Sequence, residues 1–274
     1  MSMTWEGDPP PSSDRIGARG WLRVTRRASA IILVILVGLA VKIPLRLIEA
    51  PIHGARRPWT PHITRIVCRV SLWAMGLRFA RQGQPMEGQG AIVANHSSWL
   101  DIFVLNASDN LYFVSKSEVA RWPGIGFLAR VTGTVFIARD RREAQAQKGL
   151  FEDRLGAGHR LLFFPEGTST DGLRVLPFKP TLFAAFFAPT LADVISVQPV
   201  SVTYFAPDGD DPRKYGWWGD MSFDSHLLAT LALPRQGRVE VVYHPALKVA
   251  DFKDRKALAA ASETAVREGH RLAD

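Results

Sequence analysis

Residues 91–101 read AIVANHSSWLD, and they place a histidine and an aspartate where the two side chains can act together. Residues 91–94 form a short apolar run typical of a buried strand, and residues 98–107 have the pattern of a helix. His96 therefore stands at the end of a strand, with Asp101 five residues further on, past a tight turn. A carboxylate there can accept a hydrogen bond from one ring nitrogen, which leaves the other free to take a proton from a hydroxyl.

This pair alone does not establish a catalytic site. Of the seven histidines, only His96 has an acidic residue five positions later, but the chain has 26 acidic residues and one such pair arises easily by chance. The competing interpretation makes Asp101 a helix-start residue beside an ordinary loop histidine. The rest of the chain has to decide between the two.

Apolar runs alternate with helical patterns from residue 90 onward, which predicts an α/β fold, a sheet covered by helices. Pro199 lies inside one apolar run and cannot donate to a strand ladder, which favours an edge position for that strand. The expected strands are 91–94, 111–115, 134–138, 161–164, 197–204 and 238–243. The expected helices are 98–107, 117–131, 142–157, 180–190 and 254–271.

The composition narrows the class of protein. The chain has 274 residues, 47% of them hydrophobic, enough for one large core and an appendage. Its single cysteine, Cys68, excludes an intramolecular disulfide and any multi-cysteine metal site. Residues 1–61 hold nine Lys/Arg against four Asp/Glu, a net charge of +5, whereas the other 213 residues hold 25 against 22, a net charge of +3. The basic excess thus belongs to the N-terminus, which argues against a nucleic-acid-binding core.

The N-terminal region predicts a membrane anchor. Residues 1–20 are rich in Pro, Ser, Gly and charge, and we expect them to be a disordered basic leader. The uncharged run 28–41 is shorter than the roughly 20 residues of a membrane span. No cleavage site follows it, which disfavours a signal peptide. A tilted single span remains possible, but Lys42 and Arg46 fit a helix immersed in one leaflet better.

A second amphipathic stretch, residues 62–81, follows and completes a helical hairpin over residues 21–82. The alternative is that this stretch is a core helix of the globular domain. With the hairpin, residues 83–274 form the main domain. If the first helix is instead a tilted single span, the positive-inside rule puts Arg23, Arg26 and Arg27 on the cytoplasmic side.

Three further blocks carry polar residues at the ends of predicted strands. Residues 133–139 read GTVFIAR, and Arg139 is a fork-shaped donor suited to phosphate or carboxylate. Residues 164–169 read FPEGTS, where Glu166 would be costly to bury without a partner. Residues 197–200 read VQPV. Taken singly, a solvated charge run and an edge strand are the simpler interpretations of the first and third blocks. An ordinary polar turn fits residues 168–172 of the second block but explains Glu166 poorly.

Together with the block from Asn95 to Asp101, these blocks resemble the glycerolipid acyltransferase family, the lysophosphatidate-acyltransferase-like enzymes. The resemblance covers residues 90–204 well and the flanks loosely. It implies an acyltransferase domain with a mixed sheet over residues 83–274, behind an N-terminal two-helix membrane motif. It also implies that His96, held by Asp101, acts as general base on the hydroxyl of an acceptor, which attacks the thioester of an acyl donor.

The resemblance further implies which residues bind the acceptor and which molecules take part. Backbone N–H groups near Ser97 or Gly167 are candidates for stabilising the oxyanion. No Gly-x-Ser-x-Gly elbow surrounds Ser97 or Ser98, which disfavours a serine nucleophile. No bound cofactor or metal is expected, and acyl carrier protein or acyl-CoA supplies the acyl group at the cytoplasmic face of the inner membrane. The expected substrate-binding residues are Arg139, Glu166, Gly167, Thr168, Lys116 and Lys179.

The identity of the acceptor depends on less specific features. Many lysophosphatidate enzymes have a basic residue and a glycine after Pro-Phe-Lys, but residues 177–183 read PFKPTLF and lack both. Residues 169–179 and 215–221 resemble instead the branch that acylates lyso-ornithine and related aminolipids, although residues 215–221 are equally consistent with a structural aromatic lid or an interfacial tryptophan anchor. We therefore favour an aminolipid acceptor, with 1-acyl-sn-glycerol-3-phosphate as the alternative. A catalytically idle lipid-binding relative and a thioesterase are alternatives from other classes.

Overall fold

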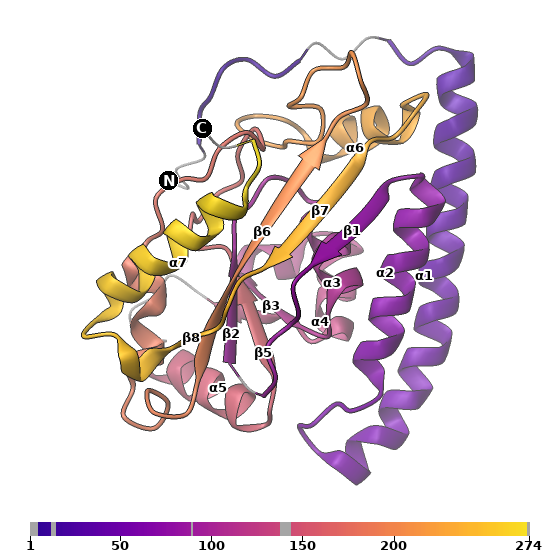
Figure 1. Ribbon diagram of the computed structural model, residues 1–274. Helices are drawn as coiled ribbons and strands as arrows, with labels where there is room; N and C mark the ends of the chain where they lie inside the picture. The colour runs from indigo at the N-terminus through magenta and orange to yellow at the C-terminus, as the bar shows by residue number, and fades with distance from the viewer. Residues whose placement is uncertain (1–4, 12–14, 89, 138–143, 273–274) are drawn as a thin grey trace.

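The structure is a computed structural model that describes residues 5–11, 15–88, 90–137 and 144–272, with backbone alone for residues 144–148. Its centre is a sheet with the strand order β1-β7-β6-β2-β5-β3-β4, in which β8 pairs with β6 (Figure 1). Most neighbours are parallel, and β6 runs antiparallel to β7 and β8. The predicted mixed sheet is thus confirmed. The strands are β1 (Arg78–Gln82), β2 (Gly90–Ala94), β3 (Tyr112–Lys116), β4 (Val135–Ile137), β5 (Arg160–Phe163), β6 (Ser196–Phe205), β7 (Arg238–Tyr243) and β8 (Leu247–Lys248).

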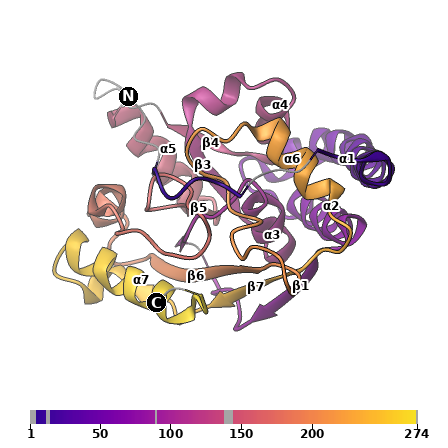
Figure 2. The ribbon, with the colours of Figure 1, turned by 90° about the horizontal axis from the view of Figure 1, so that it is seen from above.

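Helices cover both faces of this sheet (Figure 2). Every residue of β2 is buried, since the strand lies between β5 and β6 and carries helices on either side. Ile92 and Ala94 pack into one apolar cluster, and Ala91 and Val93 into the other. The helices are α1 (Ala18–His53), α2 (Thr60–Met75), α3 (Asp101–Ser108), α4 (Ile125–Thr132), α5 (Ala144–Gly156), α6 (Phe223–Ala232) and α7 (Arg255–Gly269), with a 3-10 helix at Pro180–Phe187.

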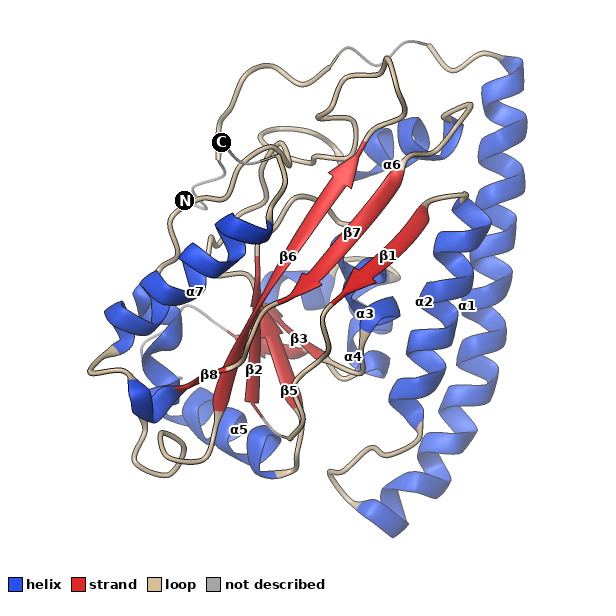
Figure 3. Cartoon of the chain, viewed as in Figure 1, coloured by secondary structure: helices blue, strands red, loops and turns tan. Residues whose placement is uncertain are grey.

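The two N-terminal helices form a hairpin that lies lengthwise along the sheet domain (Figure 3). α2 packs between α1 and α3, and α1 also contacts α6. Large apolar side chains remain exposed along α1, among them Leu33, Leu36 and Leu47. Of the described residues, α1 is the one helix long and apolar enough to cross a membrane by length and composition.

The second helix of the hairpin ends earlier than the sequence pattern predicts. Gly76 adopts a left-handed conformation, with φ +85°, and its amide N–H closes the end of α2. The following residues form β1, which pairs in parallel with β7, so the helical prediction for residues 76–81 was wrong. The side chains of β1 alternate between exposed and partly buried, as is typical of an edge strand. The helical hairpin therefore spans residues 18–75.

The edge position that we predicted for the strand containing Pro199 was also wrong. β6 is central, and Pro199 pairs in register with Val93 of β2. On the other side of β6, Pro199 accepts a hydrogen bond from the His244 N–H at 3.0 Å. The Gln198 side chain donates to the His244 carbonyl at 2.9 Å. The neighbouring side chain thus supplies the hydrogen bond that the proline nitrogen cannot donate.

Other differences are local. The predicted helix 117–131 divides into a 3-10 helix at Ser117–Arg121 and α4, with Pro123 and Gly124 between them. The predicted helix 180–190 is the 3-10 helix named above. β8 and α6 were not predicted. Residues 138–143, which include part of a predicted strand and the start of a predicted helix, lie outside the described residues.

Candidate active site

The turn that carries His96 is fixed to the middle of the sheet by Asn95. The Asn95 carboxamide accepts a hydrogen bond from the Val202 N–H and donates one to the Val202 carbonyl, both at 2.8 Å. The Asn95 side chain thus continues the hydrogen bonding between β2 and β6 beyond their last paired residues, Ala94 and Val200. This bracing role of Asn95 was not part of the sequence prediction, because Val202 is 107 residues away.

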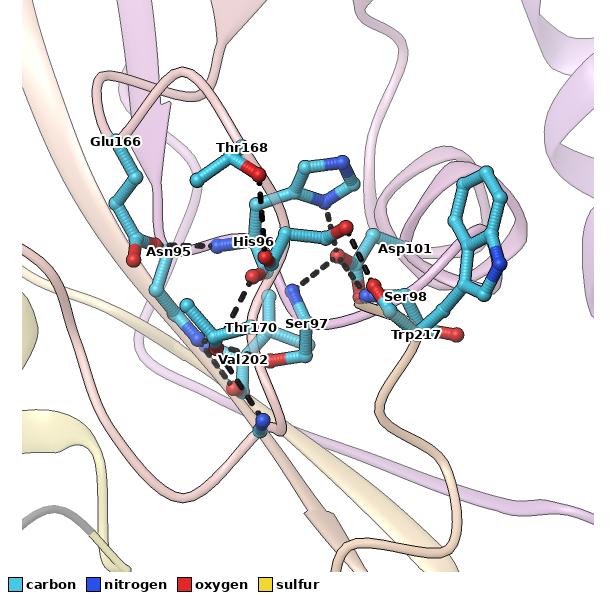
Figure 4. A network of polar contacts seen from close by, with 12 residues as sticks. Asn95, His96, Ser97, Ser98, Asp101, Glu166, Thr168, Thr170, Val202 and Trp217 are labelled. Carbon is cyan, nitrogen blue, oxygen red and sulfur yellow. Dashed lines mark hydrogen bonds and ion pairs between the residues drawn. The ribbon is translucent and has the colours of Figure 1, made fainter. Parts of the chain in front are cut away.

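His96 and Asp101 form the predicted pair (Figure 4). His96 Nδ1 lies 2.7 Å from Asp101 Oδ2, and Asp101 begins α3. The other ring nitrogen, Nε2, points away from Asp101. The His96 side chain is 21% exposed, so this nitrogen stands at the accessible side of the pair. The arrangement is that of a base whose orientation is set by a buried carboxylate.

Asp101 is fully buried, and donors surround it. Besides His96, the backbone N–H groups of Ser97 and Ser98 donate to Oδ2 at 2.9 and 3.0 Å. The Tyr204 hydroxyl donates to Oδ1 at 2.7 Å. Burial, and then the neighbouring Asp101, raises the pKa of Tyr204 well above its usual value, so its hydroxyl remains a donor. Four donors therefore stabilise one buried carboxylate, and Tyr204 is a positioning residue that the sequence did not reveal.

An aromatic ring from the FPEGTS block packs against the face of the His96 imidazole. The Phe164 ring stacks on the His96 imidazole, with centroids 4.0 Å apart and planes 10° apart. Phe164 directly follows β5, the neighbour of β2, and the two parallel strands end at the same edge of the sheet. The FPEGTS block therefore lies beside His96 because β5 and β2 are neighbours in the sheet, as expected for motifs at the carboxyl ends of adjacent parallel strands.

Glu166 is buried and links the loop that carries His96 to the loop that carries Leu176. Its carboxylate is 1% exposed and accepts hydrogen bonds from the backbone N–H groups of His96, at 2.6 Å, and Leu176, at 2.7 Å. Burial raises the pKa of Glu166 to about 8, although these two N–H donors act in the opposite direction. In this structure Glu166 positions the backbone of His96.

Gly167 and Thr168 form the accessible part of the same turn. Gly167 has φ +75°, and a Cβ at this position would come within 2.6 Å of Lys179 Nζ. The structure thus brings Lys179, predicted as a basic site residue, directly against Gly167. The backbone N–H of Lys179 donates to the Pro165 carbonyl at 3.0 Å, which fixes the position of this residue.

The remaining predicted basic residues are less closely defined. Lys116 ends β3, which places it at the same edge of the sheet as the end of β5. Arg139 lies outside the described residues.

The backbone amides proposed for the oxyanion have other partners. The Ser97 N–H donates to Asp101, and the Gly167 N–H donates to the Phe164 carbonyl at 3.0 Å. The N–H groups of Ser97 and Gly167 themselves thus shape their turns, and an oxyanion donor among the neighbouring amides stays a prediction. Ser97 and Ser98 are also buried, at 1% and 0% exposure, which agrees with the argument against a serine nucleophile.

Residues of the N-terminal leader lie at the rim of this site. The Trp5 N–H donates to Thr168 Oγ1 at 3.3 Å, and the Trp5 ring packs against that of Trp218, with centroids 6.3 Å apart. Trp218 Nε1 donates to the Asp8 carbonyl at 3.2 Å. We expected residues 1–20 to be disordered, whereas residues 5–11 contact the aromatic segment 215–221 and the turn that carries Thr168.

Comparisons with known proteins agree with this geometry. A family model described as acyltransferase matches residues 78–203, and the chain belongs to the acyltransferase family. It is 58% identical to the lyso-ornithine lipid O-acyltransferase of Rhodobacter capsulatus, over 97% of this chain and 96% of that protein. It is 29% identical to the 1-acyl-sn-glycerol-3-phosphate acyltransferase of Neisseria gonorrhoeae, over 70% of this chain and 74% of that protein.

The fold has a counterpart among solved structures. The crystal structure of the 1-acyl-sn-glycerophosphate acyltransferase of Thermotoga maritima superposes with a TM-score of 0.64 at 18% identity. The match covers 92% of this chain and 96% of that one, and so includes most of the N-terminal hairpin as well as the sheet. The family resemblance and the fold class predicted from the motifs are confirmed, and the protein is an acyltransferase.

Proposed function

We propose that the protein transfers a fatty acyl group from an acyl thioester to the hydroxyl of a lyso-ornithine lipid. The single observation that carries the reaction is the His96–Asp101 pair, with Nδ1 held at 2.7 Å and Nε2 directed away. The 58% identity to a lyso-ornithine lipid O-acyltransferase over nearly the whole chain supports the choice of acceptor.

The chemistry follows from the orientation of the imidazole. Nε2 takes the proton of the acceptor hydroxyl as its oxygen attacks the thioester carbonyl, while Asp101 stabilises the imidazolium that forms. The tetrahedral intermediate then collapses, the carbon–sulfur bond breaks, and the leaving thiolate takes the proton from Nε2. The acyl group passes directly to the acceptor, and no covalent acyl-enzyme forms.

Basic residues around the turn supply the binding of the acceptor. Lys179 lies against Gly167, at the accessible part of the loop that Glu166 joins to His96. An ornithine headgroup carries a carboxylate, which an ammonium in this position can pair with. We assign Arg139, Thr168 and Lys116 to the same acceptor region, and Glu166 and Gly167 to shaping it.

The hairpin supports a place for the enzyme on one leaflet of a membrane. α1 lies along the sheet domain through α2 and α6, so a helix perpendicular to the bilayer would draw that domain into the hydrocarbon. The exposed leucines of α1 instead suit a helix that lies in the interface. We place the enzyme on the cytoplasmic face of the inner membrane, where acyl carrier protein and acyl-CoA are available as donors.

The test uses purified full-length protein in mixed micelles with lyso-ornithine lipid and either acyl carrier protein or coenzyme A thioesters. We expect ornithine lipid to form with wild-type protein and not with the His96→Ala variant. Release of free fatty acid without ornithine lipid would identify a thioesterase instead. No turnover of lyso-ornithine lipid with either donor would contradict the proposed acceptor.

A further inference from the structure

A second cluster of charged residues lies at the opposite end of the sheet from His96. The turn between α1 and α2 meets the amino ends of β3 and β5, whereas His96 follows the carboxyl end of the parallel strand β2. A hollow of about 350 Å³ opens there. We call it the hairpin-tip site. Its lining includes His53, Arg56, Arg57, Tyr112, His159 and Arg160.

Two guanidinium groups meet on one aromatic ring at this site. Arg57 lies 5.9 Å and Arg154 lies 4.7 Å from the centroid of the Tyr112 ring. Arg154 donates to the Gly133 carbonyl at 2.7 Å, but its Nε is buried without a hydrogen-bond partner. Among the described residues, neither arginine forms an ion pair. Two neighbouring cations on one ring repel each other unless an anion lies between them.

The nearby carboxylates are already engaged elsewhere. Glu49 pairs with Arg46 at 3.1 Å and also accepts from Thr60. Asp109 pairs with Arg160 at 2.9 Å. Glu49 still attracts Arg57 through space, but neither acid forms an ion pair with Arg57 or Arg154.

A buried imidazole adds an unsatisfied polar group to the same hollow. His159 is 5% exposed, and neither ring nitrogen forms a well-aligned hydrogen bond with a described residue. Burial, and then the charges of Arg154 and Arg57, lowers the pKa of His159 to about 4, while a contact with the Ala55 carbonyl acts in the opposite direction. The neutral ring keeps one N–H to donate. A buried polar group without a partner is rare in folded proteins unless a ligand completes it.

We propose that the hairpin-tip site binds one phosphate-type anion, supplied by the headgroup of a membrane lipid. The arginine forks match the geometry of phosphate oxygens, and the site lies on the same hairpin as exposed apolar side chains. Ile48, Ile52 and Trp59 are 58%, 62% and 39% exposed around the tip. A lipid held here would have its phosphate on Arg57 and its chains beside these residues.

Native mass spectrometry of the full chain in detergent tests this proposal with three probes. They are dioleoyl-phosphatidylglycerol, dioleoylglycerol, which has the same chains without phosphate, and inorganic phosphate. We expect one phosphatidylglycerol molecule to remain bound per chain, and dioleoylglycerol not to be retained. Arg57→Gln and His159→Gln should each weaken the retention at least tenfold. Arg78→Gln, which removes the same charge from an exposed position on β1, should change it less than twofold.

Each other outcome overturns a defined part of the proposal. Equal retention of both lipids, or full retention by Arg57→Gln, would refute an anion site at the tip. Displacement of phosphatidylglycerol by millimolar inorganic phosphate would refute the lipid as its source. Thermal unfolding of each variant shows whether a loss of binding reflects a loss of fold. The site is independent of the acceptor that the enzyme acylates, so its failure leaves the proposed function untouched.

Discussion

Replacing Asp101 by asparagine separates the charge of the catalytic pair from its geometry. In the wild-type protein, Oδ2 accepts from His96, Ser97 and Ser98, and Oδ1 accepts from Tyr204. An asparagine can keep its carbonyl oxygen at the Oδ2 position and turn its amide towards the Tyr204 hydroxyl, which can rotate to accept. The orientation of His96 then survives, while the imidazolium formed during the reaction loses its buried anion.

We expect Asp101→Asn to lower kcat by about 10²–10⁴-fold, or roughly 3–5 kcal/mol in activation free energy, as for general-base catalysis elsewhere. The unfolding free energy should fall by only about 1–2 kcal/mol, since the three donors to Oδ2 keep a neutral acceptor and the Tyr204 oxygen accepts from the new amide. Steady-state acylation assays and denaturant titrations in micelles measure the two quantities.

Tyr204→Phe is the matched control, because it removes one hydrogen bond from the same carboxylate without touching His96. We expect it to lower kcat less than tenfold. If Asp101→Asn kept kcat within threefold of the wild-type value, the carboxylate would not support a base at His96, and the reasoning would fail.

Three further substitutions test other parts of the structure. His96→Ala should abolish acyl transfer while circular dichroism and the unfolding temperature stay close to wild type, because the side chain lies at the accessible side of the site; residual turnover above about 1% would exclude it as the base. Because the folded-state pKa of Glu166 is raised to about 8, its contribution to stability is complete below about pH 4.5 and is lost as the pH rises towards 8. The unfolding free energy of wild type minus that of Glu166→Gln should therefore fall by roughly 1 kcal/mol per pH unit over this window, and a flat difference would contradict the shift. Arg27 donates to the Leu231 and Leu233 carbonyls at 2.8 and 2.7 Å, so Arg27→Ala should cost about 2–3 kcal/mol in denaturant titrations, whereas the exposed Arg26→Ala should cost less than about 0.5 kcal/mol; equal effects would show that α1 is not held to α6 in this way.

The sequence was sufficient to predict the elements whose signal is local. The run 91–94 is continuously apolar because β2 is buried on both faces, and such a run identifies a central strand without knowledge of its partners. The His96–Asp101 spacing is local as well, since both residues belong to one turn. These features allowed the fold class and the contact between His96 and Asp101 to be predicted together.

Features that depend on distant partners were not predictable in the same way. The cost of burying Glu166 indicated that it needed a partner, but the partners are backbone amides of His96 and Leu176, brought near by the strand order. Tyr204 reaches Asp101 across 103 residues. β1 is a short edge strand whose partner β7 lies far along the chain, so Leu77 and Arg81 were assigned to the two sides of a longer amphipathic helix.

The most direct test of the account is a competition assay with purified wild-type enzyme, one acyl thioester, and equal amounts of lyso-ornithine lipid and lysophosphatidate. We expect ornithine lipid as the main product, with its formation lost in His96→Ala. Acylation of lysophosphatidate alone would contradict the proposed acceptor, and product formation by His96→Ala would contradict the proposed base.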